Sequence, residues 1–167
     1  RFLNKNSFWL PDYALFMSLK DHFNGEPFNA WDNDIKMRDK EAILKYQNSL
    51  KEAIEFHKFL QFKAYQQWMA LKKYANSKHI EIIGDIPIYV AYDSADVWVH
   101  PEYFQLDNAR HLTHVAGVPP DGFSADGQLW GNPLYDWDYL KKDGYQFWIQ
   151  RIESQLTMYD FVRIDHF

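Results

Sequence analysis

The chain of 167 residues contains no cysteine, which excludes a disulfide framework, a thiolate metal site and a cysteine nucleophile. It has no uninterrupted apolar run near the roughly 18 residues that a membrane span needs, so we expect no membrane partner. Positive charge is also scarce: 18 Lys and Arg stand against 23 Asp and Glu, and the net charge is −5. Because a nucleic acid or an anionic membrane favours a basic face, we expect neither as a partner.

Aromatic residues are abundant and make up 19% of the chain, with 13 Phe, 11 Tyr and 7 Trp. Residues 1–79 are predicted to form a helical region. An apolar stripe between residues 15 and 23 predicts a helix that Gly25 can end as the residue after the C-cap. A second helical stretch begins at Asp39, as its N-cap, and continues to about residue 78. Because roughly 39 residues is long for a globular helix, we expect two consecutive helices there.

The period of the pattern changes after residue 79. Residues 80–85 are short and β-branched and predict a buried strand, and residues 161–165 predict another. Residues 144–159 fit a 3.6-residue period, which predicts an amphipathic crossover helix with Asp143 as its cap. Helices that alternate with strands in this way are typical of a parallel α/β fold, which we expect for residues 80–167.

The connection from the first strand to the crossover helix, residues 86–143, is far longer than the usual 2–6 residues. In α/β barrels the connections on this side carry the active site, whereas the short loop near residue 160 is predicted to be structural. Ten Asp and Glu but one basic residue, Arg110, lie between residues 80 and 140, which disfavours a phosphorylated substrate. Carboxylates among flat rings such as Tyr89, Trp98 and Trp130 suit a neutral polyhydroxylated ligand. The alternative is that these rings form a small core within the loop.

Alternation along the second strand places Arg163 and Asp165 on one side, inside a barrel, and Val162 and Ile164 on the other. An Arg favours the ionised form of a neighbouring carboxylate, which a nucleophile or a transition-state stabiliser requires. Asp85 ends the first strand and is expected at the same level as Asp165. The alternative interpretation is a structural ion pair without a catalytic role.

Histidine and glycine patterns give little support for a metal or a cofactor. His166 adjoins Asp165, and His111 and His114 have i, i+3 spacing, but no H-E-x-x-H motif or equivalent constellation is present. The glycines between residues 117 and 131 match neither a dinucleotide-binding nor a phosphate-binding loop. We therefore predict neither a metal site nor a cofactor.

Seven stretches in colinear order resemble the amylomaltases, also called 4-α-glucanotransferases or disproportionating enzymes, of the α-amylase-like barrel superfamily. They are residues 9–16, 55–61, 83–91, 93–98, 116–121, 127–135 and 162–167. The resemblance implies a (β/α)8 TIM barrel whose third and fourth strands are the two predicted here, with a helical subdomain and a long active-site loop. It also implies an internal fragment of a cytoplasmic enzyme, which needs the remainder of the catalytic domain as its partner.

The family's activity, as the resemblance implies it, is retaining transfer of α-1,4-glucan segments between maltodextrins. Asp165 takes the role of the nucleophile, and Arg163 positions it. Substrate binding is assigned to Asp85, Asp121, Phe123, Gln128, Trp130 and His166.

The chain departs from the family pattern in two places. Residues 121–130 match a flexible loop that covers the bound sugars, but Gly122 stands where some relatives carry an aromatic residue. The family's acid/base Glu and a further Asp are expected beyond Phe167. We therefore predict that the 167-residue chain alone releases no measurable glucose from maltotriose. An α-glucan hydrolase of the same superfamily and a non-catalytic glucan-binding module remain as alternatives.

Overall fold

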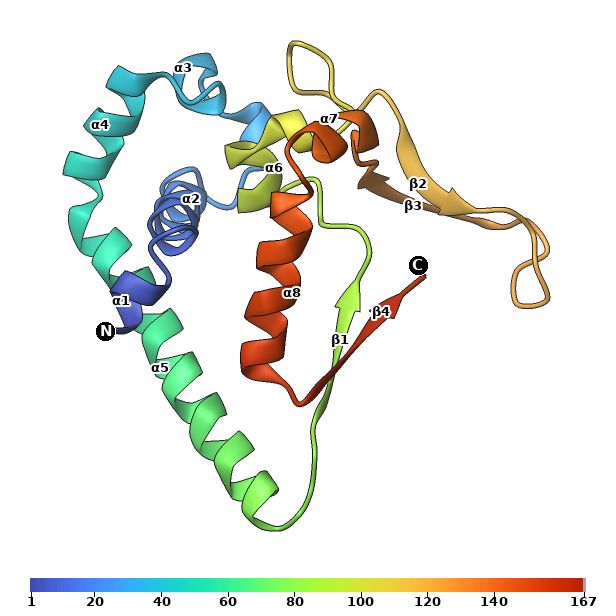
Figure 1. The fold of residues 1–167 in the computed structure, drawn as a ribbon. Coiled ribbons are helices and arrows are strands. Elements are labelled where there is room, and N and C mark those ends of the chain that lie inside the picture. Colours follow the sequence, from blue (N-terminus) through green and yellow to red (C-terminus); the bar gives the residue numbers. More distant parts are fainter. Residues whose placement is uncertain (167) are drawn as a thin grey trace.

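The computed structural model describes residues 1–166, so Phe167, the last residue of the 162–167 motif, lies outside the described residues. The fold is mixed α/β, as expected (Figure 1). Its elements, in chain order, are α1 (Phe2–Lys5), α2 (Leu10–His22), η1 (Phe28–Ala30), α3 (Asn33–Lys36), α4 (Lys40–Ser49), α5 (Lys51–Ser77), β1 (Ile83–Pro87), α6 (Ala95–Val99), η2 (Pro101–Tyr103), β2 (Val115–Val118), β3 (Gln128–Pro133), α7 (Trp137–Lys142), α8 (Gln146–Met158) and β4 (Phe161–Asp165). None of the helices within residues 1–166 is long and apolar enough to cross a membrane.

Two helices fill the second helical stretch, as predicted, and Leu50 separates them. The Asp39 carboxylate caps α4 by accepting hydrogen bonds from the backbone N–H groups of Glu41 at 2.9 Å and Ala42 at 3.4 Å. These bonds satisfy donors that have no partner within the helix. The 27 residues of α5 make it about 40 Å long, and α2 packs against it (Figure 1).

The end of α2 differs by one residue from the prediction. Phe23 is the C-cap, so Asn24, with φ 54°, takes the left-handed position that follows it. Gly25, with φ 82°, comes one place later, and its N–H donates to the Lys20 carbonyl at 2.7 Å. Asparagine tolerates the left-handed region almost as glycine does, which is why the glycine alone misplaces the cap.

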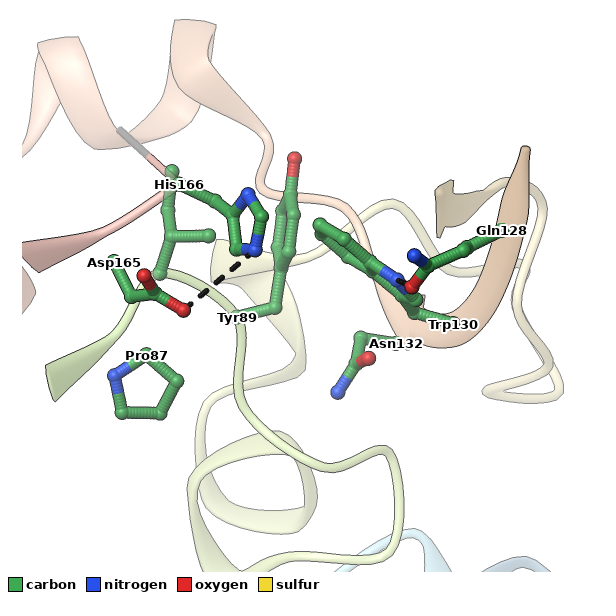
Figure 2. A pocket seen from close by; sticks show the side chains of 8 residues that line it. Pro87, Tyr89, Gln128, Trp130, Asn132, Asp165 and His166 are labelled. Carbon is green, nitrogen blue, oxygen red and sulfur yellow. Dashed lines mark hydrogen bonds and ion pairs between the residues drawn. The ribbon is translucent and has the colours of Figure 1, made fainter. Parts of the chain in front are cut away.

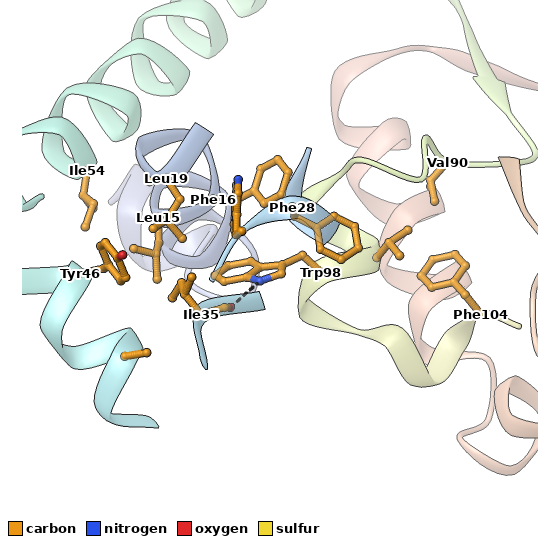
Figure 3. Close-up of a cluster of buried hydrophobic side chains, with 14 of the residues drawn as sticks. Leu15, Phe16, Leu19, Phe28, Ile35, Tyr46, Ile54, Val90, Trp98 and Phe104 are labelled. Carbon is orange, nitrogen blue, oxygen red and sulfur yellow. Dashed lines mark hydrogen bonds between the residues drawn. The ribbon is translucent and has the colours of Figure 1, made fainter. Parts of the chain in front are cut away.

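The hydrophobic core joins the helical region to the start of the long connection. Trp98 of α6 has no exposed surface, and its Nε1 donates to the Ile35 carbonyl at 3.1 Å. Its ring lies 5.8 Å from the Phe16 ring (Figure 3). The Trp31 ring also lies 5.8 Å from it. Tyr135, which also lies in the long connection, is fully buried as well. Trp98 and Tyr135 are therefore core residues, as the alternative interpretation expects, but they belong to the core shared with the helical region and not to a small core within the loop.

The parallel pairing of the two predicted strands is confirmed, because β1 pairs with β4 in parallel. The bounds of the first strand are corrected: it covers Ile83–Pro87 and not residues 80–85. Residues 80–82 are held by side chains instead, since Asn76 donates to the Ile80 carbonyl at 3.0 Å and Ile82 donates its N–H to the Asp160 carboxylate at 2.8 Å. Because this segment is held by side chains, β1 begins only at Ile83. It ends at Pro87, two residues later than predicted.

The crossover helix α8 covers Gln146–Met158, close to the predicted 144–159, but its expected cap is wrong. Asp143 is the C-cap of α7, and Tyr145 is the N-cap of α8. Gly144 and Tyr145 both have positive φ, 69° and 59°, and the Tyr145 N–H donates to the Leu140 carbonyl at 2.7 Å. This tight turn ends α7. The periodicity of α8 gives no sign of a preceding helix, which is why the pattern assigns Asp143 to the wrong one.

The long connection, residues 86–143, is an ordered segment and not one open loop. It contains α6, η2, α7 and an antiparallel hairpin of β2 and β3. The hairpin projects away from the helices, on the side toward which β1 and β4 point (Figure 1). The connection therefore brings a second group of side chains toward the carboxyl ends of the parallel strands.

The short turn before β4 is structural, as its length predicts. The Asp160 carboxylate accepts from Asn76 Nδ2 at 2.9 Å and lies 3.3 Å from Lys72 Nζ. The bond from the Ile82 N–H, together with these groups, lowers the pKa of Asp160. One carboxylate therefore ties the end of α5 to the starts of both parallel strands.

We expect Asp160→Asn to lower the thermal unfolding midpoint by a few degrees at pH 7. The pKa of Asp160 is lower in the folded state, so its stabilisation is present above the ordinary Asp pKa and disappears as the pH falls through the folded value. The difference between the two proteins should therefore be largest above about pH 5 and vanish in acid. Asp126→Asn, an exposed carboxylate of the hairpin, is the control. A difference that stays constant with pH would contradict the role of the charge.

Candidate functional site

The candidate site lies at the carboxyl ends of β1 and β4. In the strand pairing Asp85 lies opposite Arg163, and Pro87 lies opposite Asp165. Because side chains alternate along a strand, Arg163 and Asp165 share one face, and the half-buried Val162 and Ile164 occupy the other. The face that carries the charged groups is therefore the one predicted from the alternation. Asp85, however, is not at the level of Asp165 as expected. It lies two residues earlier in the pairing, because β1 continues to Pro87.

Arg163 joins the two carboxylates of this face. Its Nε lies 3.2 Å from Asp85 Oδ1, and its Nη2 donates to Asp165 Oδ1. The hydrogen bond to Asp165, followed by the charge of Asp85, raises the pKa of the guanidinium. The side chains of Arg163, Asp85 and Asp165 are 62%, 59% and 39% exposed, so the expectation that this pair is enclosed inside a barrel is not met within residues 1–166. The Arg–carboxylate contact itself is present.

A hollow of about 190 Å³ opens beside this charged face. Its lining comes from three segments: the end of β1 and the residues after it, strand β3, and the end of β4. The lining residues are Pro87, Ile88, Tyr89, Gln128, Trp130, Asn132, Asp165 and His166. Figure 2 shows Asp165 and His166 on one side, Gln128, Trp130 and Asn132 on the other, and the Tyr89 ring between them in this view.

Short contacts organise the polar and aromatic groups of the hollow. His166 Nε2 lies 3.6 Å from Asp165 Oδ2, and the His166 ring lies 4.7 Å from the Trp130 ring. Trp130 donates through Nε1 to Gln128 Oε1 at 2.9 Å (Figure 2). Tyr89 lies 6.3 Å from Trp130, measured between ring centroids. The hollow thus presents a carboxylate, an imidazole and an amide next to two aromatic faces.

Four of the predicted site residues line this hollow: Gln128, Trp130, Asp165 and His166. Arg163 and Asp85 do not line the hollow. They lie on the charged face beside it, where they form an ion pair. The structure thus joins residues that are up to 81 positions apart, from Asp85 to His166.

Asp121 and Phe123 are not brought to the hollow. They lie in the turn of the hairpin, where Asp121 Oδ1 accepts from the N–H groups of Phe123 and Ser124, both at 2.8 Å. The Phe123 side chain is 98% exposed. A Cβ at Gly122 would meet no atom within 4 Å, so the space beside this residue is open. The Asp121 carboxylate therefore shapes the turn in this structure.

Sequence reasoning missed Pro87 and Asn132 as lining residues, and it noted Tyr89 only as one of many loop aromatics. Asn132 donates through Nδ2 to the Val90 carbonyl at 2.8 Å, which attaches β3 to the segment after β1. The usable signal for Tyr89 is its place two residues after the end of β1, where ligand-binding residues of α/β folds gather.

The chemistry of this site fits a sugar. Carboxylate, amide and imidazole groups exchange hydrogen bonds with hydroxyls, and aromatic faces pack on the C–H faces of a sugar ring. Among residues 1–166, no group of three or more His, Cys, Asp or Glu side chains is arranged to hold a metal ion. What the geometry offers is one carboxylate with an arginine partner at the edge of an aromatic hollow.

Comparisons with known proteins agree on one family. The family model described as 4-alpha-glucanotransferase matches residues 1–167. The chain is 52% identical to the 4-alpha-glucanotransferase of Clostridium butyricum over 100% of its own length and 34% of that protein. With that of Thermus thermophilus it shares 50% identity over 99% of the chain and 33% of the relative. The chain thus spans about a third of these relatives.

Solved structures give the same picture. The amylomaltase from Streptococcus agalactiae, solved in complex with acarbose, superposes with a TM-score of 0.95 at 49% identity, over 99% of this chain and 34% of that one. The amylomaltase from Corynebacterium glutamicum shares the fold, with a TM-score of 0.73 at 22% identity, over 99% of this chain and 21% of that one.

Proposed function

The chain belongs to the 4-alpha-glucanotransferase family, and from that premise we propose that its complete protein transfers α-1,4-glucan segments between maltodextrins. The observation that carries the proposal is the hollow in which Asp165 lies beside Trp130, Tyr89 and His166. A carboxylate next to aromatic faces is what a retaining enzyme needs to bind a sugar ring and attack it.

We propose that β1 and β4 are the third and fourth strands of a (β/α)8 barrel, and that residues 1–79 form a helical region of the same catalytic domain. The parallel pairing, and the site at the carboxyl ends of the strands, support this. The rest of the barrel would then enclose the face that is open here. That enclosure would remove Arg163 and Asp165 from water and strengthen their interaction.

The chemical step that we propose begins at Asp165. One carboxylate oxygen attacks the anomeric carbon and forms a glycosyl ester, while the bond from that carbon to the leaving oxygen breaks. The leaving oxygen takes a proton from an acid that we expect in the remainder of the domain. The hydroxyl of an acceptor glucan then attacks the same carbon, and the ester bond to Asp165 breaks. The proton of that hydroxyl returns to the acid residue, and Asp165 is a free carboxylate again. Arg163 would hold the Asp165 carboxylate in position for its attack through the hydrogen bond between the two side chains.

Substrate binding is divided between two parts of the site. Trp130 and Tyr89 would pack on sugar faces, while Gln128, His166 and Asp85 would bind hydroxyls. Asp121 shapes the hairpin turn that presents the exposed Phe123. If the turn closes over the glycosyl-enzyme, it would exclude water and favour a sugar acceptor over hydrolysis.

The experiment is to incubate the complete protein with maltotriose and to follow the products by length. Transfer yields glucose together with oligomers longer than the substrate. The hydrolase alternative yields only shorter products, and the binding-module alternative binds maltodextrins without changing them. A product ladder without any longer oligomer would overturn the proposal.

A further inference from the structure

One arginine attaches residues 87–89, which are the end of β1 and the two residues after it, to α8. Arg151, in the middle of α8, donates from Nη2 to the Pro87 carbonyl at 2.6 Å and from Nη1 to the Ile88 carbonyl at 3.1 Å. Both carbonyls belong to residues that line the hollow. A guanidinium can bind two neighbouring acceptors at once because its donors form a rigid fork, which an ammonium lacks.

A tyrosine from the long connection adds a second attachment. The Tyr135 hydroxyl donates to the Ile88 carbonyl at 2.7 Å and lies 3.2 Å from Arg151 Nη1. Tyr135 is fully buried, and burial raises the pKa of its phenol, so the group stays protonated and remains a donor. Arg151 and Tyr135 thus both donate to the Ile88 carbonyl oxygen.

The attached segment carries an aromatic wall of the hollow. Tyr89 directly follows the bound carbonyls, and its ring stacks on the Tyr135 ring, with centroids 5.9 Å apart and planes at 21°. The Tyr89 ring also lies 6.3 Å from the Trp130 ring, measured between centroids. Pro87, the first residue of the segment, lies opposite Asp165 in the strand pairing. A shift of residues 87–89 would therefore move the wall relative to the carboxylate.

We propose that Arg151 is a positioning residue, which acts with Tyr135 to hold Tyr89 where a glucan segment binds beside Asp165. The inference rests on the proposed function for its ligand. Arg151 itself is not among the residues that line the hollow, so its effect on substrate passes through the segment it holds. It thus adds α8, none of whose residues lines the hollow, to the elements that determine substrate binding.

A purely structural role is the alternative, because Arg151 also packs over the Trp148 ring at 5.0 Å. The two roles differ in what a substitution changes. Loss of stability reduces the amount of folded protein, which lowers the apparent kcat and leaves KM unchanged. Loss of positioning weakens binding in protein that is fully folded, which raises Kd and KM.

The test uses the complete protein and maltoheptaose, with Kd from calorimetry and KM and kcat from transfer. We expect Arg151→Met to raise Kd and KM about tenfold and to change kcat by less than about threefold, the size expected when a hydrogen-bonded anchor is lost. The Kd and KM of Arg151→Lys should lie between those of the unsubstituted protein and those of Arg151→Met, because lysine keeps the charge but lacks the forked donors of the guanidinium. In a Tyr89→Ala background, Arg151→Met should weaken binding no further.

Arg38→Met is the matched control. Arg38 packs over the Trp98 ring at 4.3 Å and pairs with Asp12 at 2.7 Å, so its loss has a comparable structural effect away from the hollow, and Kd should not change. An unchanged Kd in Arg151→Met would overturn the inference. So would an Arg151→Met substitution that raises Kd by the same factor in the Tyr89→Ala background as in the unsubstituted protein. If the unsubstituted protein binds maltoheptaose but transfers nothing, the proposed function fails and the Kd comparison still decides the role of Arg151. If it binds nothing, both fail.

Discussion

Asp165→Asn should reduce glucan transfer by the complete protein about a thousandfold or more. The amide cannot form the glycosyl ester, and a residue that makes the covalent bond is not replaced by its neighbours. Binding of maltoheptaose should change far less, because Trp130, Tyr89 and Gln128 still line the hollow. The measurement is the initial rate of transfer from maltotriose, together with Kd from calorimetry.

Two controls make this result specific. Asp138→Asn replaces an exposed carboxylate at the start of α7 and should leave the transfer rate within about twofold, as surface substitutions usually do. The unfolding midpoint of the Asp165→Asn protein should stay close to that of the unsubstituted protein. A variant that keeps more than about a tenth of the transfer rate would rule out Asp165 as the nucleophile.

Trp98→Ala should lower the free energy of unfolding by about 3–5 kcal/mol, the usual cost of removing a buried large aromatic side chain. Trp98 fills the space between α2, η1 and α6 with no exposed surface. Its loss would leave a cavity, remove the bond to the Ile35 carbonyl and expose the face that packs on Phe16. Urea denaturation of the complete protein, followed by fluorescence, measures the change through the midpoint.

Phe123→Ala is the counterpart, since it also truncates an aromatic ring. With 98% of that side chain exposed, its removal should change stability by less than about 0.5 kcal/mol. Equal losses in the two variants would mean that the aromatic residues are not divided between a core and an exposed hairpin. Phe123→Ala should instead act on transfer, if the hairpin turn meets the bound sugars as we propose.

Much of the charged face could be predicted from the sequence. A two-residue period places Arg163 and Asp165 on one side of β4. The parallel arrangement of two strands joined by a helix places the end of β1, with Asp85, at the same edge of the sheet. The Asp39 cap and the break between α4 and α5 could be predicted because capping chemistry and helix length are local properties.

The remaining features depend on contacts between distant segments. β1 ends at Pro87, and begins only after Ile82 because that residue's N–H binds Asp160 from the turn before β4. Trp130 reaches the hollow because Asn132 binds the Val90 carbonyl. No periodicity encodes such contacts. Asp121 is different, since an Asp before a glycine is itself a turn signal, and its turn could have been predicted from the sequence.

The most direct test of the proposed mechanism is to trap the covalent intermediate. A fluorinated glucosyl donor that forms the ester quickly and releases it slowly is incubated with the complete protein, which is then digested, and the label is located by mass spectrometry. We predict one added glycosyl group on the peptide that contains Asp165, and none on any peptide of the Asp165→Asn protein. Label on a different carboxylate, in a protein that transfers glucan, would contradict the assignment of Asp165 as the nucleophile.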